Sequence, residues 1–180
     1  MKSLTNYITE KMVYNKANTS KYKYYPETKE ELKKVLEQLI EKRGNEGDFN
    51  DIDTSEITDM SYLFYEIEMK KFNGDISKWD VSKVEDMTGL FYGLRNFDSD
   101  LSKWDVSNVT NMHGMFYLCE KFNQDISNWD VSKVKDMGNI FTYCKSFNQD
   151  ISNWDISNVE NTYQMFKNCP IEEKYKPKFK

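Results

Sequence analysis

Large apolar residues recur along this chain at a fixed spacing of 25 residues, separated mostly by polar ones. Three columns of aromatic residues share this spacing: Phe72, Phe97, Phe122 and Phe147; Trp79, Trp104, Trp129 and Trp154; and Phe91, Phe116, Phe141 and Phe166. A period of this length is typical of proteins whose repeats stack side by side around a shared core. The pattern therefore predicts four stacked repeats with the tryptophan column buried.

Two kinds of apolar spacing alternate within each repeat. Over residues 126–131, apolar residues nearly alternate with polar ones, which predicts a short strand. Over residues 134–141 they recur every three or four positions, which predicts a short helix. Where Ser82 precedes Glu85, the serine is expected to open a capping box. The expected fold class is an α/β repeat solenoid, a leucine-rich-repeat-like right-handed coil with short parallel strands and short helices.

The segment ahead of the repeats carries a different pattern. Residues 1–25 are polar without a clear period, and they predict a loosely held N-terminal arm. Residues 26–44 contain a capping-box sequence from Thr28 to Glu31, followed by apolar residues at helical spacing. They predict an amphipathic helix over residues 28–43 that caps the exposed edge of the first coil. Binding of this helix in a groove of a partner is the alternative.

The stack itself is expected to span residues 45–169, with one degenerate coil ahead of the four full repeats, because terminal repeats are often atypical. Residues 170–180 contain two prolines and four lysines, and they are expected to form a tail that covers the last coil. If that cover is incomplete, a homodimer through the C-terminal edge is expected.

Composition narrows the classes of function. Mean hydropathy is −0.81, yet aromatic residues make up 15% of the chain, so the apolar surface is concentrated in a few large side chains. The net charge is −5 with acidic and basic residues interleaved, and the clustered basic face that nucleic-acid binding needs is missing. No apolar run approaches the ~20 residues of a membrane span, and residues 1–18 lack the apolar core of a secretory signal. We therefore expect no membrane span, no nucleic-acid partner and no export by the usual route.

The three cysteines, Cys119, Cys144 and Cys169, stand one per repeat. Leu94 occupies the same position in the first repeat, which indicates a buried apolar column rather than a disulfide framework. A zinc site is not expected, since no C-x-x-C pair or histidine cluster accompanies the thiols. His113 is the only histidine, its position varies between repeats, and we expect it to face water. No catalytic residue is predicted, because no nucleophile or orienting partner accompanies it.

Two columns of aspartate also follow the repeat: Asp75, Asp100, Asp125 and Asp150, and Asp80, Asp105, Asp130 and Asp155. Such residues often cap turns by accepting hydrogen bonds from nearby backbone amides. Calcium bound between the coils is the alternative, because stacked carboxylates repel one another unless a cation lies between them. Turn capping is preferred, since the glycine-rich loops of calcium-binding repeats are missing here, and no cofactor is predicted.

The run from Phe122 to Met137, followed by Ile140, Phe141 and Cys144, closely resembles the repeats of BspA-like leucine-rich-repeat surface proteins, also described as the PARCEL type. The resemblance extends over residues 48–169. It implies a leucine-rich-repeat-like solenoid and bacterial surface proteins that adhere to host or neighbouring cells, without catalytic residues. The resemblance suggests a cell-surface or secreted location, and the missing signal and anchor make a cytoplasmic location the alternative.

These observations predict a non-enzymatic protein-binding solenoid that serves as an adhesion or interaction module. Binding is expected where the repeats differ, because a rigid ladder with a different side chain on each rung suits recognition. Two candidate columns are Lys78, Lys103, Asn128 and Asn153, and Lys83, Asn108, Lys133 and Asn158. A further variable column holds Tyr92, Tyr117, Thr142 and Lys167. The alternatives are a glycan-binding adhesin fragment, a structural or phage-borne module, and an enzyme.

Overall fold

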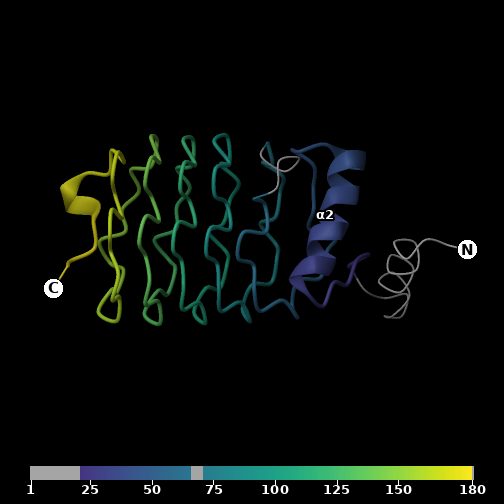
Figure 1. Ribbon diagram of the computed structural model, residues 1–180, viewed down its shortest axis with the longest axis horizontal. Helices are drawn as coiled ribbons and strands as arrows, with labels where there is room; N and C mark the ends of the chain where they lie inside the picture. The colour runs from purple at the N-terminus through teal and green to yellow at the C-terminus, as the bar shows by residue number, and fades with distance from the viewer. Residues whose placement is uncertain (1–20, 66–70, 180) are drawn as a thin grey trace, which may run out of the picture.

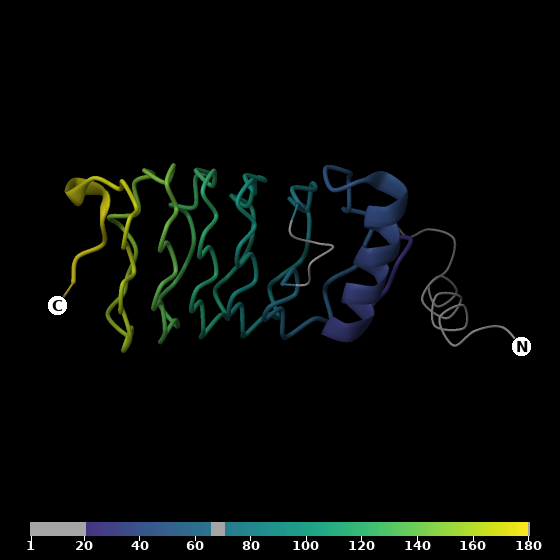
Figure 2. The ribbon, with the colours of Figure 1, turned by 45° about the horizontal axis from the view of Figure 1, so that its top comes forward.

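The computed structural model describes residues 21–65 and 71–179. Coils stand side by side along one long axis, from helix α2 at the N-terminal end to the short 3-10 helix η2 near the C-terminus (Figure 1). Figure 2, turned about that axis, shows the same single row of coils. Residues 1–20, which make up most of the predicted arm, lie outside the described residues.

Helix α2 spans Lys29–Arg43 and begins where the sequence predicts. The Thr28 hydroxyl accepts a hydrogen bond from the Glu31 N–H at 3.2 Å. The Glu31 carboxylate accepts one from the Glu27 N–H at 2.9 Å, one residue earlier than in a capping box. The helix ends at Gly44, whose left-handed backbone (φ 75°) stops the helix while its N–H closes the last turn.

The apolar face of α2 covers the N-terminal end of the core. Leu32 and Leu36 are fully buried there, and burying a side chain of this size contributes about 1.5–3 kcal/mol. Polar contacts fix both ends of the helix to the first coil. Lys29 Nζ lies 2.5 Å from a carboxylate oxygen of Asp59, and the Arg43 guanidinium donates two hydrogen bonds to the Asp51 carboxylate.

The predicted fold class is wrong in its secondary structure. Within the described residues the helical elements are α2 and η2, which spans Glu173–Tyr175, and no β-sheet is formed. Neighbouring coils meet instead through isolated parallel bridges, for example Asp86 with Asn111 and Asn111 with Asp136. The short parallel strands and short helices of a leucine-rich-repeat-like α/β solenoid are therefore absent from the described coils.

Much of each coil is built from turn units of five residues. In the unit Asp130–Val134, the aspartate carboxylate accepts a hydrogen bond from the Ser132 N–H at 3.0 Å, and the Val134 N–H donates to the Val131 carbonyl at 2.9 Å. The units at 125–129 and 136–140 repeat both bonds. The first and last apolar residues of a unit are thereby brought to the inside of the coil.

An apolar spacing of three positions fits these turns as well as a helix, and the polar residues decide between them. Ser82, expected to cap a helix with Glu85, instead gives its N–H and hydroxyl to the Asp80 carboxylate at 3.0 and 2.6 Å. Aspartate, serine and glycine favour turns because they bond to nearby backbone or tolerate left-handed conformations. The chain is consequently bent round at short intervals instead of continuing as a helix.

The coils are joined by backbone hydrogen bonds that run mainly in one direction. Alternate N–H groups of one coil donate to carbonyls of the next at 2.8 to 3.0 Å: Met112 to Asp136, Gly114 to Gly138, Phe116 to Ile140, and Leu118 to Thr142. Paired parallel strands exchange bonds in both directions, whereas here the next coil returns one, from the Lys135 N–H to the Thr110 carbonyl. Left-handed backbone at Gly114 (φ 59°) and Leu118 (φ 63°) also interrupts the extended conformation of a strand. The coils therefore pair without forming a sheet.

The recurring aromatic residues form the core, as predicted. Each tryptophan is 4% exposed, and Trp129 stacks on Trp154 with ring centroids 6.4 Å apart and planes 4° from parallel. Phe116 stacks on Phe141 at 5.6 Å in the same manner. The Trp129 indole N–H donates to the Leu101 carbonyl of the preceding coil at 3.1 Å, which satisfies the polar atom of a buried ring.

The C-terminal tail folds back over part of the last coil. The Tyr175 carbonyl accepts a hydrogen bond from the Ile151 N–H at 3.0 Å, and the Asn148 side chain accepts one from the Glu172 N–H at 2.8 Å. Ile171 is 5% exposed and joins the core. The tail therefore covers the coil near residues 148 and 151.

Candidate functional site

The eight residues predicted to bind a partner are all exposed, and they recur in two columns. They are Lys78, Lys83, Lys103, Asn108, Asn128, Lys133, Asn153 and Asn158. Three of the asparagines donate their side-chain amide to a serine carbonyl of the preceding coil at 2.7 to 2.9 Å: Asn108 to Ser82, Asn153 to Ser127, and Asn158 to Ser132. These residues help to join the coils, and their binding of a partner stays a prediction.

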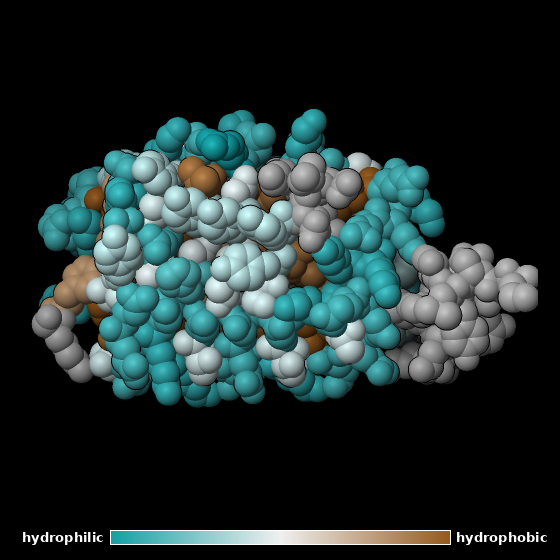
Figure 3. All heavy atoms as spheres, viewed as in Figure 1, coloured by the Kyte–Doolittle hydropathy of each residue, from teal (hydrophilic) through white to brown (hydrophobic). Residues whose placement is uncertain are grey.

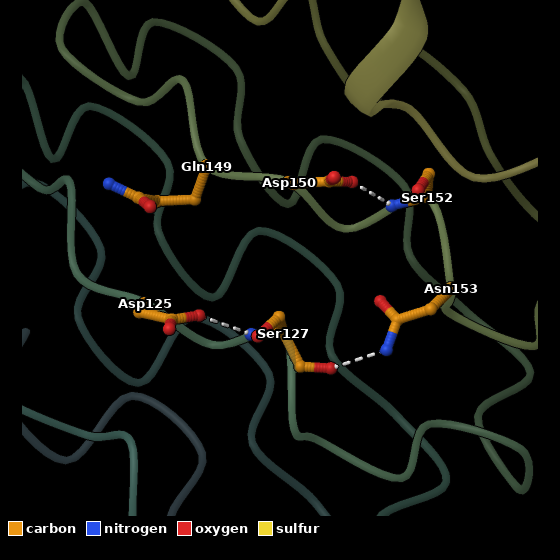
Figure 4. A pocket seen from close by; sticks show the side chains of 6 residues that line it. All are labelled: Asp125, Ser127, Gln149, Asp150, Ser152 and Asn153. Atoms are coloured by element: carbon orange, nitrogen blue, oxygen red, sulfur yellow. Dashed lines mark hydrogen bonds between the residues drawn. The ribbon is translucent and has the colours of Figure 1, made fainter.

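A shallow open pocket of about 260 Å³ lies beside one of these columns. Six side chains from two neighbouring coils line it: Asp125, Ser127, Gln149, Asp150, Ser152 and Asn153 (Figure 4). Figure 4 shows both carboxylates bonded to the N–H of the serine two residues later and the Asn153 amide bonded to the Ser127 carbonyl. Because the turns themselves use these polar groups, the pocket lacks the convergent donors of a small-molecule site.

The aspartate columns cap turns, which confirms the preferred interpretation. Each of the eight carboxylates accepts a hydrogen bond from the serine N–H two residues later, at 2.9 to 3.0 Å. Hydrogen bonds from the Ser132 side chain and backbone lower the pKa of Asp130. Residues 21–65 and 71–179 contain no group of three or more histidine, cysteine or acidic residues arranged to hold a metal ion.

His113 is half-buried between two coils, so the prediction that it faces water is only partly right. Its Nδ1 lies 3.1 Å from a carboxylate oxygen of Asp136 in the next coil. The Asn161 amide donates to the same carboxylate at 3.0 and 3.1 Å. Burial tends to raise the pKa of Asp136, but hydrogen bonds from the Gly138 N–H, Asn161 and His113 lower it overall. This cluster links three successive coils through one carboxylate.

Cys119 and Cys144 are buried, as predicted, Cys169 is only partly buried, and all three thiols are free. The Sγ atoms of Cys119 and Cys144 donate to carbonyls of Phe91 and Phe116 at 3.1 and 3.0 Å. Burial raises the pKa of both thiols. Burial also raises the pKa of the Cys169 thiol, which is only partly covered in the last coil. These thiols therefore behave as small apolar groups of the core.

The sequence analysis named Tyr92 and Tyr117 in a variable column, but it did not predict that they belong to a continuous row of tyrosines on the surface. The tyrosine ladder consists of Tyr62, Tyr65, Tyr92, Tyr117 and Tyr143, which are in ring contact from one to the next. Tyr92 and Tyr117 stack face to face at 4.7 Å with planes 6° apart. Tyr62 and Tyr65, at the N-terminal end of the ladder, are 47% and 52% exposed. Partial burial, and then the neighbouring Tyr117 hydroxyl, raise the pKa of Tyr92.

Local backbone geometry explains why the ladder does not follow one sequence column. Thr142, which shares the column of Tyr92 and Tyr117, is buried and donates its hydroxyl to the Gln164 carbonyl at 2.6 Å. Tyr143, one residue later and in a left-handed conformation (φ 61°), contacts Tyr117 instead. The recurrence of tyrosine directly after the buried phenylalanine column was the signal available in the sequence.

The face in Figure 3 is largely hydrophilic, and strongly hydrophobic atoms show only in small separate areas. The exposed large apolar side chains among the described residues are Tyr62, Tyr65, Tyr163 and Phe179. Three of the four are tyrosines, and two of them belong to the tyrosine ladder. Aromatic contact area on this protein is therefore concentrated in the ladder and at the C-terminal end.

Comparison with known proteins supplies a family but no described activity. No curated protein and no solved structure matches this chain. Among the described residues, no helix combines the length and apolar character needed to cross a membrane. The family described as "Mycoplasma protein of unknown function, DUF285" matches in two overlapping regions, residues 31–128 and 58–175, which together include most of α2, the coils and η2. The chain belongs to this family of Mycoplasma proteins of unknown function.

Proposed function

We propose that this chain is a non-enzymatic protein-binding module whose main contact surface is the tyrosine ladder. The observation that carries the proposal is a row of five tyrosines in mutual contact on a stack of coils. Tyrosine is enriched in protein interfaces because a large ring with a polar hydroxyl is ordered at low entropic cost. Four successive coils contribute to the row, so the stack sets the spacing of the contact points.

The scaffold beneath the ladder supports recognition by a preformed surface. Tyr62 lies over Gly89 of the next coil, where an added Cβ would approach the Tyr62 ring to 2.4 Å. The tyrosine positions are also joined by backbone bonds, such as that from the Gly93 N–H to the Tyr117 carbonyl at 2.8 Å. A partner that binds preordered side chains loses less conformational entropy on association.

The likeness of the repeats to BspA-like, PARCEL-type surface proteins extends the proposal to adhesion. In this extension the partner is a protein on a host or neighbouring cell. A glycan is favoured less, because a sugar ring stacks on an open aromatic face, and Tyr92 and Tyr117 cover each other's faces at 4.7 Å. Protein recognition uses the hydroxyls and ring edges, which the stack leaves free to make contacts.

A pair of matched variants tests the proposal. Wild-type protein, a ladder variant carrying Tyr65→Ala and Tyr92→Ala, and a control carrying Glu46→Ala, at an exposed position outside the ladder, would each be used to capture partners from extracts of host cells. We expect a saturable protein ligand that the control retains and the ladder variant loses by about tenfold or more in affinity. Equal capture by all three proteins would refute the ladder as the contact surface.

A further inference from the structure

The last coil ends in a row of backbone donors without acceptors. In the preceding coils, four alternate N–H groups donate forward to the next coil, as described above for Met112 to Leu118. Their counterparts in the last coil are Thr162, Gln164, Phe166 and Asn168. None of these four N–H groups meets an acceptor among residues 21–65 and 71–179.

Among the described residues, the tail backbone forms no hydrogen bond with these four N–H groups, although the Lys176 amine lies 5.7 Å from the centroid of the Phe166 ring. The backbone contacts of the tail with the coil fall near residues 148 and 151. Phe141 is fully buried in the preceding coil, whereas its counterpart Phe166 is partly exposed. Phe179 contacts Phe166 edge-on at 6.4 Å and is itself 49% exposed. The row of donors therefore lies beside aromatic surface that water still reaches.

The electrostatics of this edge differ from those of the whole chain. The peptide groups joined by the forward bonds align with their N–H groups toward the C-terminal end, which places partial positive charge there, as at a helix N-terminus. Residues 160–179 contain four lysines and three glutamates, so their net charge is +1, against −5 for the whole chain. Lys167 and Lys178 are exposed in this segment.

We infer that the C-terminal edge, residues 160–168, binds an extended acidic segment of a partner protein, added parallel to the last coil as the next rung. Carbonyls of the segment would accept from the four unpaired N–H groups. The Glu160 carbonyl would accept one N–H from the segment, as the Lys135 carbonyl does from Glu160 at 2.8 Å. Addition of a strand to an open edge is a general mode of peptide recognition. Tyr163, which is 64% exposed, would flank the bound segment.

The direction of the hydrogen bonds disfavours a second copy of this chain as the partner that binds this edge. A symmetric homodimer through the C-terminal edge would bring donor rows face to face, and the donors would remain unpaired. The opposite end of a second copy is covered by α2, as Figures 1 and 2 show. A single extended chain is narrow enough to lie beside the tail and carries the carbonyls that the row lacks.

Nuclear magnetic resonance of the full chain tests the inference residue by residue. The probe is a blocked peptide of alternating glutamate and threonine, and the control is a peptide of equal length with lysine in place of glutamate. We expect saturable shifts of the amide signals of Thr162, Gln164, Phe166 and Asn168 with the acidic peptide. Their hydrogen exchange should slow about tenfold when the peptide is at about ten times its Kd. Binding of the lysine peptide should be weaker by about tenfold or more.

Two variants separate this edge from the tyrosine ladder. Tyr163→Ala should weaken the acidic peptide about tenfold, whereas Tyr62→Ala should leave its affinity unchanged. The reverse result, or peptide shifts confined to residues outside 160–179, would overturn the inference while leaving the ladder proposal intact. Shifts of the four amides that depend on protein concentration alone would assign the edge to a second copy and would also overturn it. The inference depends on a protein-binding role but not on the ladder, so each can fail separately.

Discussion

Replacing Trp129 with alanine tests whether the stacked aromatic column holds the coils together. Trp129 is 4% exposed, stacks on Trp154, and lies 6.2 Å from Phe116 between ring centroids. Truncating a core tryptophan to alanine costs about 3–5 kcal/mol through lost burial and the remaining cavity. The change also leaves the Leu101 carbonyl without its donor, which adds about 1 kcal/mol or more. We therefore expect the free energy of unfolding to fall by about 4–6 kcal/mol.

Urea unfolding followed by tryptophan fluorescence and circular dichroism measures this loss. For a chain of this length the same change should lower the Tm by about 2–4 °C per kcal/mol. Trp129→Phe keeps an aromatic ring but removes the indole donor, and it should cost about 1–3 kcal/mol. Tyr163→Ala, at a position 64% exposed, is the matched surface control. If Trp129→Ala destabilised the protein no more than this control, the shared aromatic core would be refuted.

Three further predictions follow from the turns, the thiols and the helix cap. Serine hydrogen bonds hold the pKa of Asp100, Asp125 and Asp130 below the ordinary value, so their contribution to stability is present above about pH 4 and is lost as the pH falls through the lowered values. Asp130→Asn keeps the acceptor oxygen and should therefore retain a higher free energy of unfolding than Asp130→Ala. Urea unfolding at pH 7 and pH 3 measures both variants, and equal losses of stability in the two would show that the turn hydrogen bond is unimportant. An alkylating reagent followed by mass spectrometry should label Cys169 before Cys119 and Cys144, and simultaneous labelling in the native state would contradict their burial. Thr28→Ala should cost about 1 kcal/mol by removing the N-cap of α2, with Thr28→Ser as the conservative control, and an unchanged unfolding midpoint would dismiss the cap.

The 25-residue period and the burial of the recurring aromatic side chains could be predicted from the sequence, because both follow directly from which residue types recur and at what spacing. Trp129 and its counterparts repeat without variation, and a large apolar ring at every copy has few places to lie except a shared core. The helix at Lys29–Arg43 was predictable for a similar reason, since Thr28 and Gly44 mark its two ends. The buried tryptophan column and the helix both follow from residue types in the sequence, and contacts with the rest of the protein do not change either.

The path of the backbone within a coil was not predicted, although a signal for it was present. The five-residue units at 125–129, 130–134 and 136–140 each begin with an aspartate, as in Asp-Val-Ser-Lys-Val at 130–134. Apolar residues three positions apart satisfy a helix and a turn equally, so apolar spacing could not separate them. The hydrogen bond that each aspartate carboxylate accepts from the N–H two residues later decides in favour of the turn.

The open C-terminal edge is a consequence of this backbone path. Sheet strands exchange bonds in both directions, so an ordinary sheet edge presents donors and acceptors together. In this stack, residues with left-handed backbone such as Gly114 and Leu118 accompany the forward hydrogen bonds. The N–H groups of each coil donate to carbonyls of the next coil, so the corresponding N–H groups of the last coil are left without a coil to donate to. Adding or removing a coil would move the row of donors without removing it. A stack of this kind therefore ends in a row of backbone donors, and within residues 170–179 the tail supplies no backbone acceptor for them.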